Sequence, residues 1–269
     1  MNLNTSYYAV LLSLLAGIST GIGGMIVVFF KKRSTKILSL LLGFSAGIMV
    51  YLSFMEIFHE SQVYLTSVHG SKNGKILAIL SFLFGAVLMA FINEFIPEPH
   101  KPHQISSPVP TEKIITSQLF RTGIFTAIAV TIHNFPEGIA TYVSGVKSPA
   151  LGLSIALAIA IHNIPEGIAI SVPVYYSTRS KKKAILTSFL SGLSEPLGAI
   201  VTMLILGPII TDSVFGLVFG AVAGIMVYIA LDELLPSARE YGHEGLSMLG
   251  LMLGMALMAS GSVIFLDLG

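Results

Sequence analysis

Two copies of one short motif place metal-ligand side chains inside strongly apolar stretches. Residues 133–140 read H-N-F-P-E-G-I-A and residues 162–169 read H-N-I-P-E-G-I-A. In each copy a histidine precedes a glutamate by four residues, which puts both side chains on one face of an α-helix, one turn apart. Imidazole, carboxamide and carboxylate groups are ligands of divalent metal ions. The candidate ligands of the two copies are His133, Asn134, Glu137, His162, Asn163 and Glu166.

The proline inside each motif changes the helix around it. Pro136 and Pro165 have no backbone N–H, and their rings clash with the carbonyl group four residues earlier. We therefore expect a kink in each helix and a freed carbonyl oxygen at Ile132 and at Ile161. Each kink would add a backbone oxygen to the ligand set.

A simpler interpretation of these polar groups has to be weighed. A single histidine or asparagine in a membrane helix often serves only as a hydrogen-bonding group between helices. Buried ionisable groups in such helices are costly, however, and usually mark an ion or substrate path. One copy of the motif would leave both interpretations open. Because the chain holds two copies with histidine and glutamate in register, the duplication favours a metal site.

Composition indicates a polytopic, all-helical membrane protein. Of the 269 residues, 54% are hydrophobic and only 11% are charged, with a mean hydropathy of +0.83. The absence of cysteine excludes thiolate ligands and disulfides, so the ligands must be nitrogen and oxygen atoms. Such ligands suit zinc, iron, manganese, cobalt or cadmium better than cuprous ion. The net charge of +1 points to no partner, and we expect no nucleic-acid binding.

Eight apolar segments are each close to the length that a bilayer requires. We expect the first to be retained as a membrane span, since it is too long for a signal peptide and has no basic region before it. A single transmembrane domain, residues 1–269, would hold them all. The predicted spans are residues 7–30, 37–58, 75–96, 120–144, 150–172, 184–208, 213–235 and 246–267.

The basic residues of the connections predict the orientation. The connections after spans one, three, five and seven, together with Arg121 at the start of span four, hold 12 of the 15 Lys and Arg residues, so we assign them to the cytoplasm. Both termini then lie outside the cytoplasm, in a multi-pass protein of the cell inner (plasma) membrane. The proline-rich stretch 97–119 is expected to be a flexible cytoplasmic loop. Its His100 and His103 could bind metal weakly, but a plain linker is the favoured interpretation.

Two fainter repeats relate the ends of the chain. G-I-M-V-Y occurs at 47–51 and at 224–228, and A-G-I-S-T-G-I-G-G at 16–24 resembles S-G-L-S-E-P-L-G-A at 191–199. Spans one to three therefore look related to spans six to eight, and because spans one and six begin on opposite sides, the copies are inverted. Inverted repeats around broken helices are typical of secondary transporters. Small residues that merely allow close packing are the alternative explanation for each repeat alone.

The inverted copies differ in their chemistry. Glu195, followed by Pro196, stands where the first copy has Thr20. We expect Glu195 to be a further metal ligand, and the alternative is a protonated carboxyl group or one paired with Ser191. Near the ends of spans two and seven, Glu56 and His59 on the outer side and Asp232 and Glu233 on the inner side could line an entrance and an exit for a cation. Charged residues that simply end a span in the headgroup region are an equally good explanation.

These features together resemble the ZIP (Zrt-, Irt-like protein) metal transporters. The resemblance rests on the paired H-N-x-P-E-G motifs, the S-E-P-L-G-A segment, the eight spans and the histidine-bearing stretch after span three. It covers essentially the whole chain and looks greatest for the bacterial zinc-uptake ZupT branch. It implies a transporter that imports Zn²⁺, with Fe²⁺, Mn²⁺, Co²⁺ and Cd²⁺ as alternatives, and it implies no cofactor.

The resemblance also implies a 3+2+3 helix arrangement, a homodimer and a binuclear metal centre. One site would use His133, Glu137, His162 and Glu166. The second would use Asn134, Asn163 and Glu195, with Glu137 and Glu166 as bridges. The loop after span three is short and poor in histidine beside many eukaryotic relatives, which argues against a metal-sensing role for it.

The expected mechanism is removal of most of the water from a divalent ion, followed by its coordination between the two central helices. Because the ligands must be deprotonated, protonation would weaken binding and could couple release to pH. An intramembrane metallohydrolase is the competing class, but zinc proteases use H-E-x-x-H, whereas each helix here offers one histidine and one glutamate. A membrane metal sensor would need an output domain, which the sequence does not contain.

Overall fold

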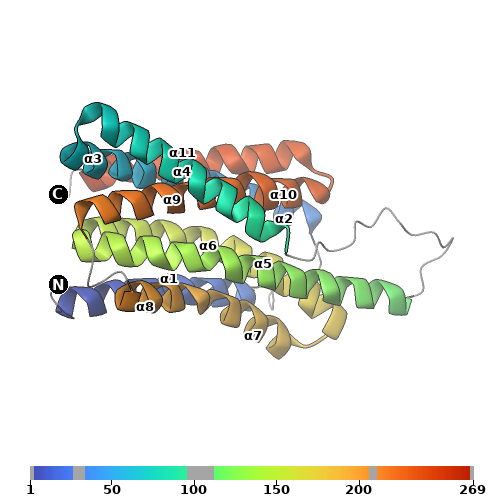
Figure 1. Cartoon of the computed structure of the whole chain (residues 1–269). Helices are drawn as coiled ribbons and strands as arrows, with labels where there is room; N and C mark the ends of the chain where they lie inside the picture. Colours follow the sequence, from blue (N-terminus) through green and yellow to red (C-terminus); the bar gives the residue numbers. More distant parts are fainter. Residues whose placement is uncertain (1–2, 27–33, 96–111, 206–210, 267–269) are drawn as a thin grey trace.

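The computed structural model describes residues 3–26, 34–95, 112–205 and 211–266, and these residues form long helices that run side by side (Figure 1). The described part of the chain contains no strand. The helices are α1 (Leu3–Ile26), α2 (Thr35–Tyr51), α3 (Phe58–His69), α4 (Ser71–Asn93), α5 (Glu112–Lys147), α6 (Pro149–Thr178), α7 (Lys181–Gly192), α8 (Ser194–Ile205), α9 (Asp212–Ile229), α10 (Leu235–Glu240) and α11 (Glu244–Leu266). Two π-helical segments, η2 (Leu52–Ile57) and η5 (Ala230–Leu234), continue α2 and α9.

Six continuous helical stretches are long and apolar enough to cross a membrane. The fourth predicted span lies in α5, which has 36 residues. The eighth corresponds to α11, whose part Glu244–Ser260 counts as a shorter apolar helix. The start of α1 and the end of α11 lie at the same end of the bundle (Figure 1), as an even number of spans requires. The predicted class, an all-helical polytopic membrane protein, is confirmed.

Two predicted boundaries differ from the structure. The second span continues through η2 and α3 to His69, and Gly70, whose φ of 78° suits glycine, separates it from α4. α5 begins at Glu112, so the last eight residues of the stretch 97–119 that we expected to be a loop are helical. Those eight residues contain no proline or glycine, and nothing in them stops a helix. The rest of that stretch, with His100 and His103, lies outside the described residues.

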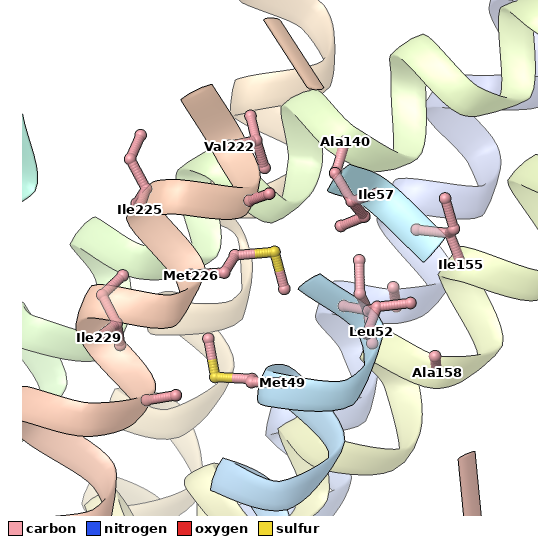
Figure 2. Packing of buried hydrophobic residues seen from close by; sticks show 14 of the residues in the cluster. Met49, Leu52, Ile57, Ala140, Ile155, Ala158, Val222, Ile225, Met226 and Ile229 are labelled. Carbon is pink, nitrogen blue, oxygen red and sulfur yellow. The ribbon is translucent and has the colours of Figure 1, made fainter. Parts of the chain in front are cut away.

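The apolar core lies where α2, α5, α6 and α9 meet. Met49 of α2 and Met226 of α9 are both fully buried and lie close to each other in Figure 2, with Leu52 and Ile229 beside them. Ala140 of α5 lies on the other side of the same cluster (Figure 2). The equivalent methionines of the two G-I-M-V-Y segments thus face each other across the middle of the molecule.

A close helix crossing joins equivalent positions of the other repeat. A Cβ atom at Gly17 of α1 would collide with the carbonyl oxygen of Gly192 in α7, and a Cβ atom at Gly192 would collide with the carbonyl oxygen of Gly17. Gly17 and Gly192 occupy the same position in the segments 16–24 and 191–199. Small residues let the two backbones touch at this point.

Other close contacts come in matched pairs as well. Gly47 of α2 packs against the carbonyl group of Leu251 in α11, and the equivalent Gly224 of α9 packs against that of Phe82 in α4. The second helix of each half thus packs against the third helix of the other half. These reciprocal contacts support the inverted repeat, while the 3+2+3 grouping stays a prediction.

Both G-I-M-V-Y segments run into π-helical backbone. η2 begins directly after Tyr51, and η5 begins two residues after Tyr228. A π-helical turn holds one residue more than an α-helical turn, so it rotates the side chains that follow it, and such turns are frequent at functional sites. Glu56 lies on η2, and Asp232 and Glu233 lie on η5.

The Gly17–Gly192 contact leads to a prediction about stability. We expect Gly17→Ala to lower the free energy of unfolding by about 1–3 kcal/mol, because the added methyl group overpacks the crossing of α1 and α7. Thermal unfolding in detergent measures the change. Gly245→Ala is the control, since no atom lies within 4 Å of a Cβ placed there and alanine favours a helix. Equal unfolding temperatures for the two variants would contradict the prediction.

Candidate metal centre

All seven predicted ligands lie buried in the middle of the helix bundle. His133, Asn134 and Glu137 come from α5, their counterparts His162, Asn163 and Glu166 come from α6, and Glu195 lies in the first turn of α8. Each of the seven is at most 1% exposed. The structure therefore buries every residue that the sequence predicted as a ligand.

The helices that carry the motifs are continuous. α5 passes through Pro136, and α6 passes through Pro165 and Pro173, without an interruption of the helix. The kinks and the freed carbonyl groups of Ile132 and Ile161 stay predictions. α5 and α6 pack directly against each other, which places the two motifs side by side.

Histidine and glutamate pair between the two helices. His133 Nε2 of α5 lies 3.1 Å from Glu166 Oε2 of α6, and His162 Nε2 of α6 lies 2.9 Å from Glu137 Oε1 of α5. Each imidazole is thus hydrogen-bonded to the carboxylate of the other motif. This reciprocal pairing merges the two copies into one centre.

Glu195 joins the centre through an asparagine. Asn163 Nδ2 donates a hydrogen bond to Glu195 Oε1 and another, of 3.1 Å, to the carbonyl oxygen of Ala16 in α1. Ser191, the alternative partner of Glu195, instead donates to the carbonyl oxygen of Ala127 at 3.1 Å. The pairing of Glu195 with Ser191 is therefore wrong as an account of this structure.

Several polar atoms of the centre are buried without a hydrogen-bond partner, which is costly in a protein interior. Among the described residues, no group of three or more His, Asp or Glu side chains is arranged to hold a metal ion. In this conformation the imidazole and carboxylate groups contact one another, so a metal ion would have to replace those contacts. The unpartnered atoms are His133 Nδ1, His162 Nδ1, Asn134 Nδ2 and Oδ1, Asn163 Oδ1, Glu137 Oε2 and Glu195 Oε2.

The four residues considered for the pathway are placed differently. Glu233 Oε2 lies 3.8 Å from His133 Nδ1, which is within ion-pair distance although too long for a hydrogen bond. Asp232 is exposed and accepts a hydrogen bond of 2.9 Å from Asn93 Nδ2. Glu56 and His59 lie on η2 and α3 within a helix that continues beyond them, and no hydrogen bond to the seven buried residues is among the described contacts. Glu233 alone of the four therefore reaches the centre.

Sequence reasoning missed one residue of the centre. Ser45 of α2 is fully buried, and its hydroxyl group lies 3.1 Å from Glu166 Oε1 and 3.3 Å from the carbonyl oxygen of His162. A lone serine in an apolar helix gives no spacing signal. A comparison of the two repeats gives a different signal, because the position of Ser45, two residues before the first G-I-M-V-Y segment, is occupied by Val222 before the second. The same comparison of repeats had drawn attention to Glu195.

The reciprocal pairs lead to a prediction about the stability of the metal-free protein. Glu137→Ala should lower the free energy of unfolding by about 1–3 kcal/mol, because it leaves His162 Nε2 buried without its acceptor. Glu137→Gln keeps an acceptor oxygen and should lower the free energy of unfolding by a smaller amount. Thermal unfolding in detergent with a chelator measures both variants, with the exposed Glu240→Ala as the control. If Glu137→Ala unfolds at the temperature of the control, the pairing contributes no stability.

Comparisons with known proteins identify the family of the chain. The ZIP zinc transporter model matches residues 97–261. A zinc transporter ZupT of Clostridium perfringens is 47% identical in a match that covers 98% of each chain. A zinc transporter ZupT of Oceanobacillus iheyensis is 51% identical over 255 residues, 93% of this chain and 95% of the relative. The matched region contains both motifs and Glu195, and the chain belongs to the ZIP zinc transporter family.

Proposed function

We propose that this protein is a transporter, not an enzyme, that imports divalent transition metal ions across the plasma membrane, chiefly Zn²⁺. The reciprocal pairing of two histidines and two glutamates inside the bundle is the observation that carries the proposal. Buried ionisable groups in membrane helices usually mark an ion path. Relatives that match nearly the whole chain are named zinc transporters, which supports the choice of Zn²⁺ as the ion.

The proposed centre binds two metal ions. His133, Glu137, His162 and Glu166 form one site, and Asn134, Asn163 and Glu195 form the other with Glu137 and Glu166 as bridges. The contact between Asn163 and Glu195 supports the second site, since it places an amide and a carboxylate next to the first four ligands. The unpartnered Oε2 of Glu137 supports the role of this residue as a bridge.

A nitrogen and oxygen ligand set does not restrict the centre to zinc. Imidazole and carboxylate ligands also suit Fe²⁺, Mn²⁺, Co²⁺ and Cd²⁺, which we include as further substrates. Two metal ions would also offset the charge of three carboxylates held away from water.

In the proposed orientation both termini lie outside the cytoplasm, and ions leave the centre toward η5. The approach of Glu233 to His133 supports an exit on that side, with the exposed Asp232 beyond it. Glu56 and His59 would serve the opposite side as an entrance. The 3+2+3 helix arrangement and a homodimer complete the proposal.

Uptake into proteoliposomes tests the transport function. We expect saturable uptake of labelled Zn²⁺ by the wild type. The uptake rate of Glu166→Ala should be lower by at least about tenfold, because a charged metal ligand is removed from the centre. Glu244→Gln, an exposed change at the start of α11, is the control and should transport like the wild type. Normal uptake by Glu166→Ala at equal protein content would rule out this centre as the route.

The number of bound ions tests the binuclear arrangement. Wild-type protein in detergent should bind about two Zn²⁺ ions per chain, and Glu195→Ala should bind about one, since Glu195 is the one carboxylate that belongs to the second site and not to the first. Equilibrium dialysis with elemental analysis measures the ratio. A ratio that Glu195→Ala leaves unchanged would contradict the second site.

A further inference from the structure

We infer that Ser45 of α2 is a positioning residue that holds Glu166 in the geometry needed to bind the transported metal ion. The inference rests on the proposed function. It assigns a role to a helix outside the α5–α6 pair, which carries six of the seven predicted ligands.

The contact is made by a fully buried hydroxyl group. Ser45 Oγ lies 3.1 Å from Glu166 Oε1 and 3.3 Å from the carbonyl oxygen of His162. The hydroxyl group has one proton and faces two acceptors. Hydrogen bonds to an ionised acceptor are the stronger kind, so the carboxylate is the favoured partner. α2 packs against α6, and the contact therefore joins the second span to the metal centre.

The two oxygens of Glu166 are held by two different helices. Oε1 accepts from Ser45 of α2, and Oε2 is hydrogen-bonded to His133 of α5. Both His133 and Glu166 are proposed ligands, so their mutual contact must break when a metal ion binds to them. Ser45 is not a proposed ligand, and its contact with Oε1 can persist because a carboxylate oxygen has two lone pairs. Ser45 then keeps the carboxylate in place during the exchange.

The other bridging carboxylate has no such support. Glu137 Oε1 pairs with His162, and Glu137 Oε2 has no hydrogen-bond partner. The position equivalent to Ser45 in the inverted repeat is Val222, whose side chain has no hydrogen-bonding group. The fold thus fixes Glu166 from outside the α5–α6 pair and leaves Glu137 free to adjust.

Groups that orient a ligand carboxylate have a known effect on binding. Their loss typically lowers metal affinity about 10–100-fold. We therefore expect Ser45→Ala to raise the KM for Zn²⁺ uptake about tenfold or more, with a smaller change in the maximal rate, because the loss affects binding of the ion.

The matched control comes from the same helix. Ser39 is also fully buried and also contacts two acceptor oxygens, the carbonyl oxygens of Ala238 at 2.7 Å and His243 at 3.0 Å. Ser39→Ala removes the same group from α2 without touching a carboxylate of the centre. In proteoliposomes we expect a raised KM for Ser45→Ala and a wild-type KM for Ser39→Ala. Equal KM values for the two variants would overturn the inference.

A double-mutant cycle on Zn²⁺ affinity separates positioning from a general loss of stability. Equilibrium dialysis in detergent compares the wild type, Ser45→Ala, Glu166→Ala and the double variant. If Ser45 acts through Glu166, Ser45→Ala lowers affinity in the wild type and leaves it unchanged when Glu166 is already alanine. The same loss of affinity in both backgrounds would overturn the inference.

The double-mutant cycle measures Zn²⁺ binding and does not require transport. Absence of Zn²⁺ uptake by wild-type proteoliposomes would reject the proposed function, whereas the binding cycle would still report whether Ser45 acts through Glu166. Normal uptake by the wild type with an unchanged KM for Ser45→Ala would reject the role of Ser45 and leave the proposed function standing.

Discussion

The arrangement of the whole bundle depends on the need to satisfy charged groups inside a membrane protein. Three glutamates and two histidines are almost fully buried in the middle of the chain, where an unpaired charge is very costly. The reciprocal contacts of 3.1 Å and 2.9 Å between α5 and α6 meet most of that need. They require the two helices to pack closely, and Gly152 of α6 accordingly lies against the backbone of Gly145 in α5. The helices around this pair then supply what it lacks.

The surrounding helices make two nearly identical motifs unequal. Gly138 packs against the carbonyl group of Glu195, and Gly167 packs in the same way against that of Thr20. The backbone contacts are therefore equivalent, but the side chains that they position are a carboxylate in one case and a hydroxyl group in the other. Ser45 and Val222 differ in the same way. The inverted repeat thus provides a symmetric frame, and single substitutions within it create the chemistry.

Local sequence patterns predicted the helices and the candidate ligands, but not the contacts that form between helices. The i, i+4 spacing placed His133 and Glu137 on one face of a helix, and hydropathy indicated a bundle of apolar helices, because both depend on local sequence. The partner of each histidine depends on how two helices pack, which no local pattern states, so the pairing of His133 with Glu166 was not foreseen. The contact of Ser45 was missed for the same reason. The long second span was underestimated because polar residues from Glu56 to Glu60 looked like its end.

The pairing also bears on how a tightly bound ion could be released. If the metal-free ligands were exposed to water or unpaired, binding would gain the full attraction of the carboxylates for the ion. Here each imidazole–carboxylate contact must first break, which offsets part of that gain. The same contacts re-form when the ion leaves, so neither state leaves Glu137 or Glu166 as an isolated buried charge. In the proposed transport cycle, the reciprocal pairs therefore keep the free energies of the metal-bound and metal-free states close enough for turnover.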